Sequence, residues 1–198
     1  MAAGGHRAPG LNKTLIFIDE GNLTGICGKL NRSIDWLKLR EQLSREHDVL
    51  EVFIYAGLPP TTPEWTEFRV KRERFLHWLE SEAFYVIRKQ GRPTTQQAYK
   101  ANVDVMMAAE MMELAIELKP DTIILVTGDG DFGFVVCKLR RRGIHVVVAA
   151  FENNLGEDLR ISASSWLDMS RIIKPTEYKN VNDDNSRTGV ESGVGGNG

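Results

Sequence analysis

Acidic side chains follow two of the apolar runs in this sequence, at positions from which they could bind a cation. Asp19 ends the run 14–19, and Asp129 and Asp131 come directly after the run 122–127. A lone Asp such as Asp19 is usually a helix cap or a turn residue. Asp129 and Asp131 are harder to explain in this way, because they lie one residue apart in a glycine-containing loop and repel each other. A bound cation would relieve that repulsion, and oxygen ligands without Cys or clustered His favour Mg²⁺ or Mn²⁺ over zinc.

A fourth carboxylate is offered by Asp104, which follows Lys100 by four residues. If a helix begins this early, the two side chains share one face of it. Taken alone, this pair is an ordinary surface pair, or an acid favoured by the helix dipole. However, Asp104 has Val103, Val105 and Met106 as neighbours, so we expect it to be half-buried and to need a partner.

The segment 128–133 also matches the G-x-G-x-x-G pattern of dinucleotide-binding loops, and Glu152 follows at about the position of a ribose-binding acid. Electrostatics argues against that interpretation, because Asp129 and Asp131 would face an anionic pyrophosphate that needs bare N–H groups. The motif also comes late, with too little chain after it for the rest of a dinucleotide fold. We therefore predict no dinucleotide cofactor.

The elements that must position these acids alternate between strand and helix. Buried strands are predicted at 14–19, 50–55, 84–87, 122–127 and 145–150. Helices are predicted from a Ser33 cap to 43, over 63–79 with Pro63 in the first turn, over 102–118 and over 132–142, where Gly143 closes the last one. This alternation predicts a three-layer α/β/α sandwich with a mostly parallel central sheet. Ligands of such sheets bind at the carboxyl ends of the strands, where the strand order reverses.

Composition sets limits on the class of protein. The 198 residues include 25 basic and 27 acidic side chains, for a net charge of −2, which excludes a protein coated in positive charge, such as a histone-like or polybasic binder. The two cysteines form no zinc motif. The start of the chain lacks the apolar core of a signal peptide, and the apolar runs are too short to span a bilayer, so we predict a cytoplasmic protein with no membrane partner. Flexible tails are predicted at 1–12 and 179–198, around one domain at 13–178.

Three segments together resemble the NYN domain, a branch of the PIN-like nuclease superfamily. They are 17–23 (FIDEGNL), 100–105 (KANVDV) and 127–132 (TGDGDF), and the resemblance covers about residues 13–172. It implies a PIN-like α/β/α fold and an acidic cluster that binds Mg²⁺ or Mn²⁺ for RNA cleavage. Asp19, Asp104 and Asp129 match the core acids of the family, Asp131 matches the fourth, and Asn22 matches an asparagine that supports the first strand end. Glu20 departs from the pattern, as an extra outer ligand or a solvated side chain, and is left out of the core set.

Basic side chains should surround an acidic centre that binds an anionic substrate. They cluster at 69–74, at 88–92 and at 138–142, and the last cluster is explained by a favourable helix C-terminus. The loop 88–99 leads directly into Lys100 and Asp104, and its Tyr99 could stack on an unpaired base. The candidate substrate-binding residues are Asn22, Arg92, Tyr99, Lys100 and Thr127.

The predicted function is a metal-dependent endoribonuclease, which hydrolyses single-stranded or loop RNA with Asp19, Asp104, Asp129 and Asp131 as catalytic and metal-binding residues. Two alternatives stay open: a catalytically silent regulator that binds RNA or protein through the same fold, and a metal-dependent phosphohydrolase of small phosphate esters. The sequence also leaves open whether one or two metal ions bind and whether the chain forms a homodimer.

Overall fold

The computed structural model describes residues 12–94 and 98–176. Six strands form one sheet in the order β3-β2-β1-β6-β7-β8, and all five neighbouring pairs are parallel. The strands are β1 (Lys13–Asp19), β2 (Asp48–Leu58), β3 (Tyr85–Gln90), β6 (Thr122–Val126), β7 (His145–Ala150) and β8 (Ser165–Asp168). The predicted fold class is confirmed.

The strand order reverses between β1 and β6. From β1 the chain moves outward through β2 to β3, and from β6 it moves outward on the other side through β7 to β8. Ile18 pairs with Val126, so the two central strands end side by side. The carboxyl ends of β1 and β6 therefore form the point at which a ligand site is expected in a sheet of this kind.

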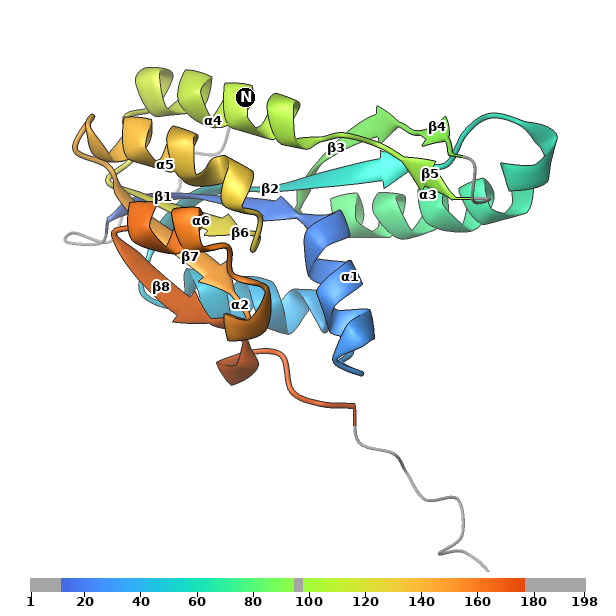
Figure 1. Ribbon diagram of the computed structural model, residues 1–198, viewed down its shortest axis with the longest axis horizontal. Helices are drawn as coiled ribbons and strands as arrows, with labels where there is room; N and C mark the ends of the chain where they lie inside the picture. Colours follow the sequence, from blue (N-terminus) through green and yellow to red (C-terminus); the bar gives the residue numbers. More distant parts are fainter. Residues whose placement is uncertain (1–11, 95–97, 177–198) are drawn as a thin grey trace, which may run out of the picture.

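Helices cover both faces of the sheet (Figure 1). One face carries α1 (Glu20–Lys29), α2 (Trp36–Ser44) and α3 (Thr66–Ser81), and the other carries α4 (Asp104–Glu117), α5 (Gly133–Arg140) and α6 (Glu157–Ser162). In β1, Ile16 and Ile18 pack toward the first face, and Leu15 and Phe17 toward the second. β1 is therefore covered on both sides, which explains its continuous apolar run.

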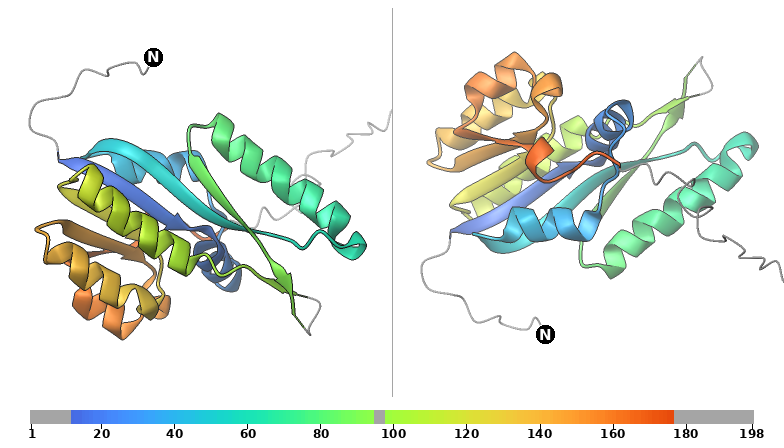
Figure 2. Two further views of the ribbon diagram at one scale, coloured as in Figure 1. Left: turned by 90° about the horizontal axis from the view of Figure 1, so that it is seen from above. Right: turned by 90° about the horizontal axis from the view of Figure 1, so that it is seen from below.

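One end of the molecule projects beyond the sheet (Figure 2). It consists of η1 (Pro63–Trp65), the start of α3 and a hairpin of β4 (Arg92–Pro93) and β5 (Tyr99–Lys100), and we call it the arm. The rings of Trp65 and Tyr99 meet edge to face, with 5.4 Å between their centroids. This contact joins the helical side of the arm to the hairpin that leads into α4.

Several elements differ from the sequence-based prediction. Asp35, rather than Ser33, caps α2, with its side chain accepting a hydrogen bond from the Lys38 N–H. The prediction missed α1, α6, β8 and the hairpin, because α1 contains glycines at 21, 25 and 28 and the other elements are short. The predicted helix at 132–142 is confirmed as α5, preceded by η2 (Gly130–Phe132) and followed by Gly143 with φ of +83°.

The predicted tails lie outside the described residues, apart from residue 12. Within 12–94 and 98–176, no helix combines the length and apolar character needed to cross a membrane.

Candidate functional site

Asp19 lies at the junction of β1 and α1 and is almost completely buried, with 5% of its surface exposed. It is the N-cap of α1, and its Oδ1 accepts a hydrogen bond of 3.0 Å from the Asn22 N–H. Burial raises the pKa of the Asp19 carboxyl to about 6, against the opposing effect of the Asn22 N–H. The negative charges of Asp104 and Asp129 raise this pKa further. A charge on Asp19 is therefore costly without a partner cation.

Thr127 connects Asp19 to the acidic loop after β6. Its hydroxyl donates to Asp19 Oδ2 at 3.3 Å and accepts from the Asp129 N–H at 3.3 Å. Asp129 in turn accepts from the Asp131 N–H at 3.0 Å through its Oδ1. Thr127 was a candidate for substrate binding, but only 2% of its surface is exposed. Its contacts instead suit a residue that holds the two strand ends together.

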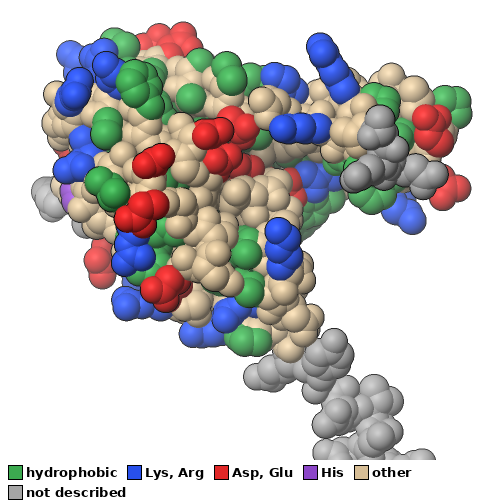
Figure 3. Space-filling view, viewed as in Figure 1, with side chains coloured by type: hydrophobic (Ala, Val, Ile, Leu, Met, Phe, Trp, Pro, Cys, Tyr) green, Lys and Arg blue, Asp and Glu red, His purple; other side chains and the backbone are tan. Residues whose placement is uncertain are grey.

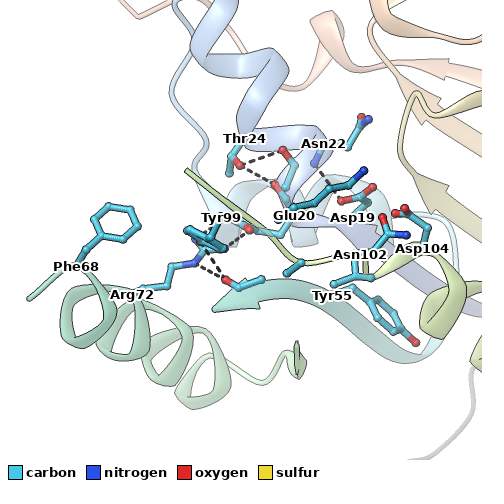
Figure 4. Close-up of a pocket in the computed structure, with 15 residues that line it drawn as sticks. Asp19, Glu20, Asn22, Thr24, Tyr55, Phe68, Arg72, Tyr99, Asn102 and Asp104 are labelled. Atoms are coloured by element: carbon cyan, nitrogen blue, oxygen red, sulfur yellow. Dashed lines mark hydrogen bonds and ion pairs between the residues drawn. The ribbon is translucent and has the colours of Figure 1, made fainter. Parts of the chain in front are cut away.

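Asp104 is the first residue of α4 and is half-buried, as the sequence predicted. Burial raises the pKa of its carboxyl, and the charges of Asp129 and Asp131 raise it further, while Lys100 lowers it. In Figure 4, Asp19, Asn22 and Asp104 lie close together at one end of the site. The four predicted acids therefore come from three separate segments and interact electrostatically at the edge of the sheet.

The donor set at this edge suits a hard divalent cation. It consists of carboxylate oxygens, and burial together with the neighbouring carboxylates raises the pKa values of Asp19 and Asp104. Among the described residues, no group of three or more His, Cys, Asp or Glu side chains is already arranged around a metal position. Mg²⁺ does not require such a cage, because it usually keeps several waters and binds through one or two carboxylates together with substrate phosphates.

Asn22 holds the loops around the acids in place. Its Oδ1 accepts hydrogen bonds from the Gly128 N–H at 3.0 Å and from Asn154 Nδ2 at 3.1 Å. The Gly128 carbonyl accepts from the Gly156 N–H at 2.8 Å. Asn22 thus ties α1, the loop after β6 and the loop after β7 together, in agreement with the supporting role that the resemblance implied.

The glycine pattern at 128–133 is explained by this packing of chain against chain. A Cβ on Gly128 would lie 2.2 Å from the carbonyl oxygen of Asn154, and one on Gly133 would lie 3.1 Å from that of Asp158. The glycines therefore allow residues 154–158, which lead into α6, to pack closely against the loop after β6. A bound dinucleotide is not needed to explain them.

Gly128→Ala should destabilise the protein by about 2 kcal/mol, because the new methyl group meets backbone that cannot move away cheaply. Gly25→Ala is the matched control: Gly25 lies inside α1, and a Cβ added there would meet nothing within 4 Å beyond the neighbouring residues and backbone of its own helix. Alanine there should stabilise by about 0.5–1 kcal/mol. Urea denaturation of both variants measures the difference, and equal stabilities would contradict the close packing at Gly128.

Glu20 is buried and ion-paired rather than solvated. Only 1% of it is exposed, and both of its carboxylate oxygens bind the guanidinium of Arg72 in α3, with the Nη1–Oε1 distance at 2.8 Å. Arg72 Nε also donates to the Gly57 carbonyl at 3.2 Å. The pair ties α1 to α3 and to the end of β2, and so fixes the arm beside the acidic edge. Sequence reasoning missed this contact, which joins residues 52 positions apart.

A groove of about 520 Å³ runs from the acids toward the arm. Asp19 and Asp104 line one end, and Lys100, Tyr99 and the exposed ring of Phe68 line the rest. Figure 3 shows acidic side chains near the middle of this face and several Lys and Arg side chains along the arm. Of the predicted substrate-binding residues, Asn22, Tyr99 and Lys100 line the groove, whereas Arg92 lies on the exposed strand β4, outside it.

Comparison with known proteins bears on the family and the fold. The model of the NYN domain matches residues 13–170. The protein LabA (low amplitude and bright) of Synechococcus elongatus is 28% identical over 81 residues, which cover 39% of this chain and 42% of LabA, so the match spans less than half of that relative. A Vibrio parahaemolyticus protein of unknown function, VPA0982, has a crystal structure that superposes with a TM-score of 0.67. It is 23% identical, and the alignment covers 83% of this chain and 96% of that one, which shows a shared fold.

The family match covers every element from β1 to β8 and includes all four acids of the site. NYN domains are nuclease-like domains with a PIN-like fold. The chain belongs to the NYN domain family, as its three acidic segments indicated.

Proposed function

We propose that the protein is a metal-dependent endoribonuclease that acts on single-stranded RNA. One observation carries the proposal: Asp19, Asp104 and Asp129 come from separate segments, yet burial and their mutual repulsion raise the pKa values of Asp19 and Asp104. Buried acids with raised pKa values, located where the strand order reverses, are the arrangement expected of a cation site.

Mg²⁺ or Mn²⁺ would be held by Asp19 and Asp104, with Asp129 and Asp131 beside them, and would neutralise the phosphate and activate water for hydrolysis. The chain itself orients the acids: the Asn22 N–H and the Thr127 hydroxyl fix the Asp19 carboxylate, and Thr127 also holds the loop of Asp129. Lys100 supplies positive charge beside Asp104. In-line attack of water on phosphorus, with cleavage of the P–O3′ bond, would leave a 5′-phosphate and a 3′-hydroxyl.

The groove on the arm side supports a single-stranded substrate. Tyr99 and Phe68 present aromatic rings along it, and stacking on such rings is the usual way in which proteins hold unpaired bases. Bases in a duplex are already stacked and would not reach these rings. A binding module without catalysis is the second candidate, because the described acids do not form a ready-made metal cage.

Circular single-stranded RNA is the best substrate for testing endonuclease activity, because only internal cleavage can open the circle. We expect the purified protein to linearise the circle in Mn²⁺ or Mg²⁺ but not in chelator, and to spare a fully paired duplex. Analysis of the ends should find 5′-phosphates. Binding of the circle without cleavage in either metal would favour the regulator instead, and cleavage that continues in chelator would contradict the metal-dependent reaction.

A further inference from the structure

A second groove, of about 500 Å³, lies between α5 and α6. Asp131 and Gly130 line its inner end, so it begins at the acidic loop after β6. It shares no lining residue with the groove that leads to the arm. In the strand order, the arm adjoins β2 and β3, whereas α5 and α6 belong to the half of the sheet formed by β6, β7 and β8. The two grooves therefore leave the acidic centre on different sides.

The outer part of the second groove is apolar and basic together. Phe134 and Ile161 are 74% and 69% exposed and line the same groove, so they belong to one apolar patch rather than being scattered single side chains. Phe134, Lys138 and Arg141 follow one another at spacings of four and three residues and so share one face of α5 and its C-cap. The Lys138 ammonium lies 4.9 Å from the centroid of the Phe134 ring. Hydrophobic side chains lie among Lys and Arg over α5 and α6 in Figure 3.

The basic residues of this cluster differ in what they do. Arg140 donates to the Ser162 carbonyl at 2.7 Å, which ties α5 to α6. Arg142 lines a separate depression with Lys119 and Asp121. Only Lys138 and Arg141 line the groove beside Phe134. A favourable helix C-terminus accounts for positive charge at 138–142, but not for an exposed ring placed under one of these cations.

We propose that this groove is a nucleotide subsite: a base of the RNA stacks on Phe134, and the adjoining phosphate binds Lys138 and Arg141. The inference rests on the proposed function and adds to it a second point of contact, across the acidic centre from the arm. A ring with a cation above it fits a ligand that combines an aromatic face with negative charge. Asp131 and Asp158 also line the groove and balance the charges of Lys138 and Arg141, so the proposed ligand depends on stacking as well as on charge. RNA held in both grooves would be bound on each side of the cleaved phosphate, an arrangement that suits internal cleavage.

Fluorescence anisotropy with labelled single-stranded RNA tests the subsite, in Mg²⁺ and on an Asp104→Asn background so that cleavage does not interfere. Arg141→Glu should weaken binding at least about 10-fold, whereas Arg142→Glu, which changes the net charge equally at the next residue, should stay within about 2-fold. Phe134→Ala should weaken binding about 10-fold, and Phe134→Tyr should restore it. Because Phe134 is exposed, its variants should keep the parent's melting temperature, whereas the two Arg→Glu variants reverse a charge at the C-terminus of α5 and should lower the melting temperature by similar small amounts.

The outcomes separate the subsite from the proposed function. Equal binding by the Arg141 and Arg142 variants, together with normal binding by Phe134→Ala, would overturn the subsite even if the parent cleaves RNA; the exposed surface would then suit a protein partner. If the variants show the predicted differences in RNA binding but the parent does not cleave RNA, the subsite is supported and the nuclease activity is overturned. Absence of both RNA binding and cleavage in the parent would overturn both.

Discussion

Asp104→Asn should lower the rate of RNA cleavage at least about 100-fold, and Asp19→Asn should do the same, because each removes a charged ligand from the proposed metal site. Asparagine keeps the size of the side chain and an oxygen acceptor. In Asp19→Asn, the bond from the Asn22 N–H and the cap of α1 can therefore persist. The loss should appear in the rate at saturating Mn²⁺ and not as a loss of folded protein.

Asp35→Asn is the matched control for these variants. Asp35 caps α2 in the way that Asp19 caps α1, with its Oδ1 accepting from the Lys38 N–H at 3.0 Å. However, Asp35 does not line the groove that leads from the acids to the arm. We expect it to cleave like the parent. If Asp19→Asn and Asp104→Asn also cleave like the parent, with contaminating nuclease excluded, the acids are not the catalytic centre. If all three lose activity together, the effect is structural.

The position of the acids could be predicted because it follows from local sequence. Asp19 ends one apolar run and Asp129 follows another; both runs were predicted to be buried parallel strands, and parallel strands bring their carboxyl ends to one edge. The place of Asp104 could not be predicted from local sequence alone. Its apolar neighbours predicted that it is half-buried, but only the family resemblance predicted that it lies in one site with Asp19 and Asp129. The repulsion among all three now adds to burial in raising the pKa values of Asp19 and Asp104.

The missed features depend on contacts between distant segments. Glu20 and Arg72 read separately as an unusual acid and one of several basic residues on a helix, and nothing local indicates that they form a buried pair. Likewise, the glycines at 128 and 133 match a nucleotide-binding pattern. A backbone needs glycine wherever another group packs closely against it, whether that group is a bound nucleotide or another segment of the chain. Sequence alone could not show that the partner is the chain itself at 154–158.

Asp19→Asn should also stabilise the protein in chelator at neutral pH, while it destroys activity. The carboxyl of Asp19 has its pKa raised from the ordinary 3.8 to about 6, mainly by burial. Between these values the folded state holds a proton that the unfolded state has lost, so the free energy of unfolding falls as the pH rises. Above about pH 6 both states are ionised, and the full cost of about 3 kcal/mol is present. Below about pH 4 both states are protonated, and the cost vanishes.

Thermal melts of the parent and the variant at pH 4 and pH 8, in chelator and in Mn²⁺, measure this effect. Asparagine resembles a protonated aspartate, so the two melting temperatures should nearly coincide at pH 4, whereas at pH 8 in chelator the variant should melt on the order of 5–10 °C higher. Mn²⁺ at pH 8 should raise the parent more than the variant, because a ligand that binds only the folded state stabilises it by mass action. A variant that melts below the parent at pH 8, with neither protein responding to Mn²⁺, would show that Asp19 serves only as a helix cap. If Asp19 is a metal ligand, Asp19→Asn lowers the activity but raises the stability in chelator. If Asp19 only stabilises the fold, the same substitution lowers the stability.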